Sequence, residues 1–258
     1  MTAEPARSIQ SSLLEHLLEL QKRIKHALMG TALCIGVAWV FHEELFAWVM
    51  DPYVKATIAK GLPNAGKLAY RGLAEAFVVY FKVAMIVGGI ASVPWILFQA
   101  WLFVAPGLYK RERQLVLPFI LSTIFCFGAG ILFARYVLLT VAVEMLLGIA
   151  DTNLVPMIMM EEYFSFAAAS MLLMGLVFET PVFISFLAMI GLVKFASLTK
   201  HWRYAVVGAF IIGALFPSPD IFTQLLIAGP LVVLYFLSAG IVWLIERSRL
   251  ARAEGEAG

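Results

Sequence analysis

The chain alternates between six long apolar runs and shorter polar segments. The runs cover residues 27–45, 77–98, 117–140, 163–190, 204–216 and 221–237. They are continuous and do not alternate between apolar and polar positions, so they predict helices rather than the strands of a membrane barrel. Because a spanning helix takes roughly 17–25 apolar residues, we expect an all-α polytopic membrane protein with six transmembrane helices.

We expect residues 1–258 to form a single membrane domain, because no repeat, low-complexity tract or soluble domain interrupts the pattern. Its predicted parts are a cytoplasmic amphipathic N-terminus at 1–26, a six-helix transmembrane core at 27–237, and the end of the last helix with a cytoplasmic tail at 238–258. The first run could also serve as a signal-peptide core. However, WVFHEE at 39–44 is too bulky for a good cleavage site, so we expect an uncleaved anchor.

Composition narrows the class of protein further. Hydrophobic residues make up 62% of the chain, charged residues only 14%, and the mean hydropathy is +0.91. A typical soluble domain is about 45–50% apolar and about 25% charged, which argues against a nucleic-acid binder, a secreted scaffold or a disordered chain. Cys34 and Cys126 lie inside apolar runs and lack the spacing of a metal site or a disulfide framework. We therefore expect no metal and no cofactor.

Basic residues gather on one side of the predicted membrane. Six spans place both termini on the same side, together with segments 99–116 and 191–203. These two segments and the chain ends hold 13 of the 19 Lys and Arg residues, whereas the opposite loops hold four, all of them in the first loop. By the positive-inside rule, we expect both termini in the cytoplasm.

The N-terminal segment has the pattern of an amphipathic helix. Ser12 with Glu15 fits a capping box, and Leu or Ile recurs at helical spacing at positions 13, 17, 20, 24 and 28. We expect this helix to lie at the cytoplasmic interface and then to turn into the first span. Its charged face includes Glu19 and Arg23, whose i,i+4 spacing also suits an ordinary surface ion pair worth about 0.3–0.5 kcal/mol.

The fifth apolar run is short for a membrane span. Residues 204–216 make 13 positions, which is about 20 Å of helix, against a hydrocarbon core of about 30 Å. We therefore predict short fifth and sixth helices. Their connecting turn, PSPD at 217–220, should lie below the far membrane surface, or the membrane should thin around it.

The second cytoplasmic loop carries the most distinctive sequence. Apolar residues run from Trp101 to Ala105, and Pro106 with Gly107 ends the helix. Glu112 is then the only acid of this loop, which otherwise carries basic residues. Such a carboxylate is most often an internal salt-bridge partner, but it also suits an incoming guanidinium group. The loop sequence leaves both interpretations open.

Apart from Glu43 and Glu44 at the end of the first run, three charged residues lie within the apolar runs. Glu179 lies about sixteen residues into the fourth run, close to Pro181, which removes a helix hydrogen bond. An intramembrane acid is a functional hypothesis by default, and the alternative is a protonated carboxyl bonded to a neighbouring helix. Lys82 and Arg135 lie near the ends of their runs, where long side chains snorkel to the interface. We expect ordinary roles for both of these basic residues.

Four motifs in register with the six runs resemble those of the TatC family, the multispanning core of the twin-arginine protein translocase. They are HLLEL at 16–20, WLFVAPGLYKRER at 101–113, FETPV at 178–182 and PSPDIFTQ at 217–224. Each motif alone is weak, but together they extend over nearly the whole chain in the right order. The family has six membrane helices and cytoplasmic termini, in agreement with the pattern of apolar runs and charges.

The resemblance implies a receptor in the cell inner membrane rather than an enzyme. Its ligands would be the twin-arginine signal peptides of folded precursor proteins, and its partners the single-span TatA and TatB proteins and further copies of itself. Transport would be driven by the proton-motive force. By motif match, Glu19, Phe103 and Glu112 would belong to the signal-peptide site. Glu179 would be the membrane-embedded acid that meets a partner, and Asp220 the acid of the last periplasmic turn.

Two positions depart from the family pattern, and rival functions have to be weighed. Gln21 stands where the family usually has an arginine, and Phe236 stands where a glutamate is common in the sixth span.

The main rival function is that of a secondary transporter that uses Glu179 and Asp220 as ion or proton ligands, although the paired broken-helix repeat of such transporters is not apparent. An intramembrane hydrolase is disfavoured because the chain has neither HExxH nor GxSxG.

Overall fold

The computed structural model describes residues 4–62, 65–69, 72, 74–104, 116–149, 157–215 and 220–257. In this part of the chain the predicted all-α class is confirmed, since the only β pairing described is an isolated bridge between Ala69 and Met159. The elements are α1 Glu4–Val40, α2 His42–Ala59, α3 Glu75–Val104, α4 Val116–Phe133, the π-helix η3 Ala134–Leu138, α5 Leu139–Ile149, α6 Met160–Phe178, α7 Thr180–Met189, α8 Phe195–Ala214 and α9 Ile221–Ala257.

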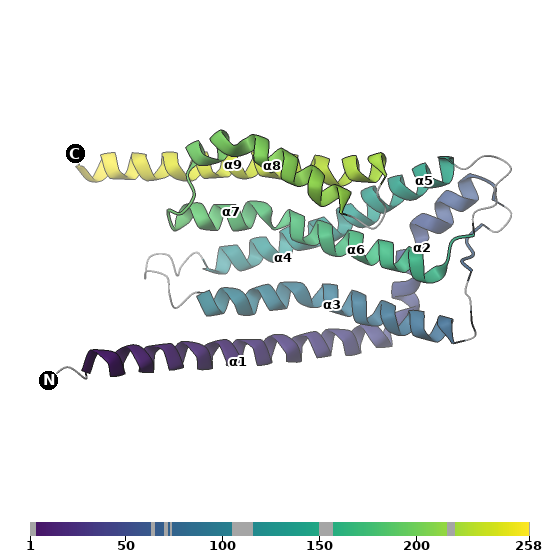
Figure 1. Ribbon diagram of the computed structural model, residues 1–258, viewed down its shortest axis with the longest axis horizontal. Coiled ribbons are helices and arrows are strands. Elements are labelled where there is room, and N and C mark those ends of the chain that lie inside the picture. Colours follow the sequence, from purple (N-terminus) through teal and green to yellow (C-terminus); the bar gives the residue numbers. More distant parts are fainter. Residues whose placement is uncertain are drawn as a thin grey trace.

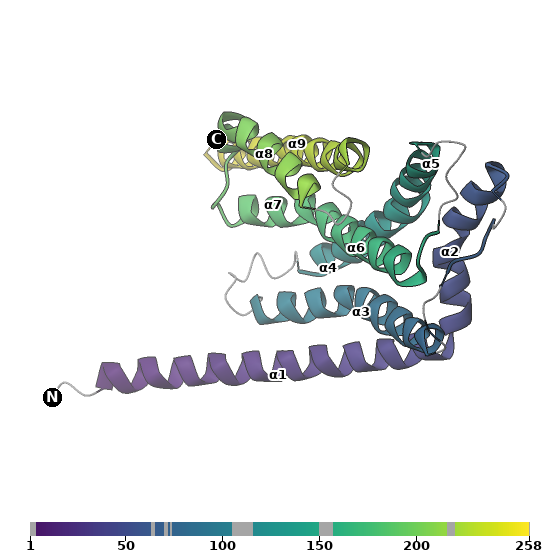
Figure 2. The same cartoon turned by 45° about the vertical axis from the view of Figure 1, so that its right-hand side comes forward.

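The long helices run side by side, and α2 lies across one end of them (Figure 1). The start of α1 and the end of α9 lie at the same end of the bundle, which we call the terminal end. The end of α5 and most of α2 lie at the opposite, far end (Figures 1 and 2). α2 is bent by 80° from α1. The main pairs in contact are α1 with α3, α4 with α6, α8 with α9, and α7 with α9.

Four helical stretches within the described residues are long and apolar enough to cross a membrane: Phe77–Phe103, Leu117–Gly148, Met160–Met189 and Ile221–Arg249. The bent pair of α1 and α2 makes a fifth candidate if it is counted as one span. α8 is not among these candidates, because its first half is rich in polar residues. The structure therefore supports a multi-pass membrane protein, while the count of six spans stays a prediction.

The predicted turn between the N-terminal helix and the first span is absent. α1 is one continuous helix of 37 residues, and it runs straight through the boundary that we expected near residue 26 (Figure 1). Neither Pro nor Gly occurs from residue 6 to residue 29, so no helix-breaking residue bends the chain there. The amphipathic segment at the start of α1 therefore runs along the bundle axis instead of lying across it.

The last two helices are longer than the predicted short pair. α8 has 20 residues and α9 has 37, because both continue into polar sequence toward the terminal end. The prediction of short helices is wrong in this respect, since it counted only the apolar positions. The other ends of α8 and α9 nevertheless stop short of α2 and α5 at the far end (Figures 1 and 2). Residues 216–219 of their connection lie outside the described part.

The core lies along the middle of the bundle, and many apolar side chains also face outward. Phe127, Met174 and Ile227 are almost completely buried. By contrast, Phe125 of α4 is 76% exposed and is one of many large apolar residues on the outer surface. Soluble proteins rarely expose large contiguous apolar surfaces, so this distribution is that of a bundle with lipid around it.

Glycine residues let two pairs of helices approach closely. A Cβ atom at Gly88 of α3 would lie 2.6 Å from the Cα of Ile35 in α1. A Cβ atom at Gly130 of α4 would collide with the carbonyl oxygen of Met174 in α6. Small residues at helix contacts are typical of membrane bundles, where close van der Waals packing drives association. These contacts set the spacing of the α1–α3 and α4–α6 pairs.

The charge bias gives a topology prediction. Accessible tags placed at Ser8 and Gly255 should both react with cytosolic reagents, and a tag at Asn153 should react only with reagents in the periplasm. The warrant is the excess of Lys and Arg on the side of both chain ends. Labelling of Asn153 by a cytosolic reagent alone would overturn the topology.

Candidate functional site

The first and second motifs meet at the terminal end of the bundle. α1 and α3 are tied together where Trp95 Nε1 donates a hydrogen bond to the carbonyl oxygen of His26 at 2.9 Å. Closer to the terminal end, the rings of His16 and Phe103 lie with their centroids 4.5 Å apart. Packing of α1 on α3 therefore places the predicted site residue Phe103 beside the motif at 16–20.

Glu19 is partly buried and is bonded within its own helix. Arg23 Nη2 donates to Glu19 Oε1 at 3.3 Å, so the i,i+4 ion pair expected from the spacing is present. The Glu19 side chain is 30% exposed, and the carboxylate is thus accessible from outside the bundle. Gln21, which replaces the usual arginine, is exposed on the same helix. Glu112 lies outside the described residues, so its distance from Glu19 stays a prediction.

Gln99 is a candidate that the sequence analysis missed. It lies one turn before Phe103 on the same face of α3, since residues four apart share a helix face, and it is only 4% exposed. Within the described residues, its Oε1 atom has no hydrogen-bond partner. Leaving a buried acceptor unpaired costs about 1–3 kcal/mol, so this oxygen is suited to a donor from a ligand. In the sequence, the feature that could have identified Gln99 is its amide side chain inside an otherwise apolar stretch.

Glu179 lies at the junction of α6 and α7, with Pro181 in the first turn of α7. Together with Trp101 of α3 and Thr123 of α4, it lines a cavity of about 210 Å³. Trp101 Nε1 donates to Thr123 Oγ1 at 3.4 Å, and Glu179 Oε1 is buried with no hydrogen-bond partner among the described residues. The carboxyl group therefore faces a pocket between three helices. Trp101 connects this pocket to the motif that contains Phe103.

Asp220 is the N-terminal cap of α9. Its Oδ1 atom accepts a hydrogen bond from the backbone N–H of Thr223 at 2.7 Å. A capping aspartate of this kind typically stabilises a helix by about 1 kcal/mol. The geometry thus gives Asp220 a structural role at the start of α9.

The part of the chain that the structure describes contains no cluster of three or more His, Cys, Asp or Glu side chains able to hold a metal ion.

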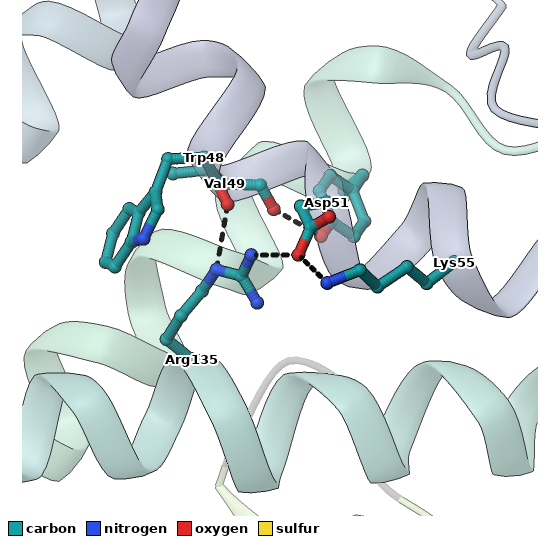
Figure 3. A network of polar contacts seen from close by, with 6 residues as sticks. Trp48, Val49, Asp51, Lys55 and Arg135 are labelled. Atoms are coloured by element: carbon teal, nitrogen blue, oxygen red, sulfur yellow. Dashed lines mark hydrogen bonds and ion pairs between the residues drawn. The ribbon is translucent and has the colours of Figure 1, made fainter.

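The expectation that Arg135 snorkels to the interface is wrong, because Arg135 is 3% exposed in the π-helix η3. Figure 3 shows its guanidinium group pointing at α2: Nη2 donates to Asp51 Oδ2 at 2.7 Å and Nε donates to the carbonyl oxygen of Trp48 at 2.8 Å. Lys55 pairs with the same carboxylate at 2.9 Å. The hydrogen bonds from Arg135 and then from Lys55 hold the pKa of Asp51 below its usual range. This network fixes α2 across the far end.

Removing the carboxylate of this network should be far more destabilising than removing its exposed lysine. Asp51→Ala leaves the buried guanidinium of Arg135 without its carboxylate partner, which should lower the free energy of unfolding by about 3 kcal/mol. Lys55 is 74% exposed, so Lys55→Ala should change it by less than about 1 kcal/mol. Thermal unfolding in detergent measures both variants. Similar melting temperatures for the two would contradict the assigned role of Arg135.

A larger cavity lies at the far end of the bundle. It has a volume of about 560 Å³, and its lining from α2, α5 and α6 is mainly apolar but includes Glu161 and Glu162. Lys82 of α3, which is 47% exposed, forms an ion pair with Glu161. None of the predicted site residues within the described ranges lines this cavity, and we assign it no ligand.

Comparison with known proteins decides the family. The family model described as Sec-independent protein translocase protein (TatC) matches residues 15–230. The chain belongs to the TatC family. Together with the apolar helices, membership makes it a multi-pass membrane protein of twin-arginine protein transport, and the resemblance drawn from the four motifs is confirmed.

Relatives within the TatC family match over most of their length. The TatC of Koribacter versatilis (strain Ellin345) is 38% identical over 247 residues, covering 95% of this chain and 90% of the relative. The TatC of Escherichia coli (strain K12) is 33% identical over 223 residues, covering 86% and 84%. The crystal structure of the twin arginine translocase receptor TatC has a TM-score of 0.77 at 31% identity, covering 89% of this chain and 98% of that chain.

Proposed function

We propose that this TatC protein is the core receptor subunit of the twin-arginine translocase in the cell inner membrane, and that it binds the twin-arginine signal peptides of folded precursor proteins at its cytoplasmic face. The observation that carries the proposal is the contact between His16 and Phe103, whose ring centroids are 4.5 Å apart. This contact joins two motifs at the terminal end, where a cytoplasmic ligand would arrive. The similarity to a structure described as a twin arginine translocase receptor supports it.

Carboxylates are the natural acceptors for a pair of arginines. Arginine presents a planar fork of donors that a carboxylate accepts in two parallel hydrogen bonds, whereas lysine presents a point charge. In the proposed site, Glu19 and Glu112 take one guanidinium group each, and Phe103 provides an apolar surface beside them. Each charge-assisted hydrogen bond contributes about 1.5–3 kcal/mol. Two such contacts give selection by sequence and still permit release.

The basic neighbours of the two carboxylates add selectivity. Lys110, Arg111 and Arg113 surround Glu112 in the sequence, and Arg23 is bonded to Glu19. These charges repel a peptide that is merely basic. In a peptide with two well-placed guanidinium groups, the bidentate hydrogen bonds to the carboxylates offset this repulsion. Specificity in the proposed site thus depends on geometry more than on net charge.

The second part of the proposal concerns assembly. Glu179 contacts a polar group of a TatA or TatB helix, which would enter the pocket that Glu179 shares with Trp101 and Thr123. The unpaired, buried Oε1 of Glu179 supports this role, because interhelical hydrogen bonds are a means by which membrane helices associate. Further copies of this chain complete the working complex, and the proton-motive force drives transport.

Export of a folded reporter tests the function as a whole. The chain is expressed in cells that lack their own TatC, with a reporter carrying an Arg-Arg or a Lys-Lys signal peptide. We expect export of the Arg-Arg reporter alone, and we expect it to stop when the proton-motive force is dissipated. Equal export of both reporters would contradict the proposal. Solute uptake by the purified chain in liposomes without any precursor would favour a secondary transporter that uses Glu179 and Asp220.

A further inference from the structure

The first turns of α8 carry a basic and aromatic cluster that the proposed function does not use. Lys200, His201, Trp202, Arg203, Tyr204 and Val207 line an open cavity of about 520 Å³. All six side chains are exposed, and the lining contains no acid. Glu246 of α9, which packs near the start of α8, is engaged elsewhere: its Oε1 accepts the backbone N–H of Phe195 at 2.9 Å.

The cluster continues into an apolar stripe on the same face of the helix. Lys200, Arg203, Tyr204 and Val207 are at i, i+3, i+4 and i+7, which is one side of an α-helix. Ile211 and Leu215 extend this side and are 55% and 80% exposed. The apolar part, from residue 204 to residue 215, is about 16 Å long. That length is close to one leaflet of a hydrocarbon core about 30 Å thick.

Aromatic rings mark the level of the membrane interface in this cluster. The guanidinium group of Arg203 lies over the Trp202 ring at 5.8 Å from its centroid, and the rings of His201 and Tyr204 are 6.1 Å apart. Trp and Tyr are enriched where hydrocarbon meets headgroups. Along α8, the cations Lys200 and Arg203 are therefore interleaved with the amphipathic rings of Trp202 and Tyr204, and apolar side chains follow. A phospholipid likewise has its charged headgroup at one end and its acyl chains at the other.

We propose that this face of α8 binds an anionic phospholipid from the leaflet at the terminal end of the bundle. Lys200, His201 and Arg203 hold the phosphate group, and one acyl chain lies along Val207, Ile211 and Leu215. Basic pockets on the cytoplasmic side of membrane proteins recognise anionic headgroups in this way. A phosphate ligand explains why Lys200 and Arg203 lie beside the imidazole of His201 with no acid in the lining, whereas an apolar partner helix would leave the two cations unpaired. The proposal is independent of signal-peptide binding.

Native mass spectrometry of the full chain, released from vesicles of phosphatidylglycerol and phosphatidylcholine in equal amounts, tests the proposal. We expect phosphatidylglycerol to be retained on the wild-type protein, and the retained fraction to fall about tenfold in the double variant Lys200→Gln, Arg203→Gln. Arg247→Gln is the matched control, because Arg247 lies over the Trp243 ring at 5.4 Å in α9 but does not line the cavity. It should retain the lipid as the wild type does.

Four outcomes would overturn the proposal. The first is equal retention of both lipids by the wild type. The second is a loss of phosphatidylglycerol in Arg247→Gln that is as large as the loss in the double variant. The third is displacement of the lipid by millimolar inorganic phosphate, which would identify a free phosphate site. The fourth is a double variant that keeps the lipid but loses a co-purifying single-span protein, which would identify a protein contact. All substituted side chains are exposed, and unchanged thermal unfolding in each variant checks that the fold is intact.

Discussion

Replacing Glu19 by lysine abolishes capture of Arg-Arg signal peptides, while the protein remains folded and inserted in the membrane. The substitution removes a carboxylate acceptor and puts a repelling charge where a guanidinium group docks. Loss of one charge-assisted hydrogen bond of about 1.5–3 kcal/mol weakens binding about 10–150-fold, and repulsion weakens it further. Glu112→Lys is expected to have the same effect from the other side of the site.

Crosslinking of a radiolabelled precursor to the membrane-embedded variants measures this loss. Glu44→Lys is a matched control, because Glu44 is an exposed acid of α2 and lies away from the terminal end. Folding should survive in Glu19→Lys, since the ion pair with Arg23 is partly exposed and such pairs contribute at most about 1 kcal/mol. Crosslinking at the wild-type level in Glu19→Lys would contradict the assignment of Glu19, as would an equal loss in Glu44→Lys.

Replacing Glu179 by alanine stops export of precursor proteins, although signal peptides still bind. Alanine removes the carboxyl group from the pocket beside Trp101 and Thr123, and with it the acceptor that we assign to a partner helix. Glutamine keeps one acceptor oxygen and nearly the same shape. If the hydrogen bond to the partner is what counts, Glu179→Gln exports at close to the wild-type rate. If ionisation counts, both variants fail.

Export assays and partner co-purification, carried out on the same membranes, separate these cases. We expect Glu179→Ala to lose TatA or TatB during purification and to keep its capture of Arg-Arg peptides. Thermal unfolding of the variant serves as the folding control. An alanine variant that exports at the wild-type rate would eliminate both roles and leave Glu179 as a structural residue at the junction of α6 and α7.

Hydrophobic runs predicted the long helices α3, α4, α6 and α9, because a long apolar stretch in a membrane has few alternatives to a helix. They did not predict α2, which begins after a break and an 80° bend inside the first predicted run. They failed where the boundary depended on polar sequence. α8 begins at Phe195 rather than near residue 204, and α9 continues to Ala257, since helices extend beyond the hydrocarbon core into water. The straight course of α1 could have been predicted, because neither Pro nor Gly occurs between residues 6 and 29.

The surroundings of single residues were harder to predict than the helices. Arg135 looked like a snorkelling side chain because its partner Asp51 is 84 positions away in the sequence, and only the crossing of α2 brings them together. Gln99 was missed for a similar reason: its burial depends on how α3 packs. By contrast, the proximity of the first and second motifs, seen in the contact of His16 with Phe103, agrees with the assignment of both to one site.

The receptor role is tested most directly by titrating the purified protein, in lipid nanodiscs, with a signal peptide that carries Arg-Arg and with the same peptide carrying Lys-Lys. The two peptides have the same net charge, so a difference between them reports recognition of the guanidinium fork. The proposed receptor role predicts that the Arg-Arg peptide binds at least about tenfold more tightly than the Lys-Lys peptide. This ratio corresponds to about 1.4 kcal/mol of binding free energy, which the lysine peptide lacks because it cannot form the bidentate hydrogen bonds. Equal affinity for the two peptides would contradict it.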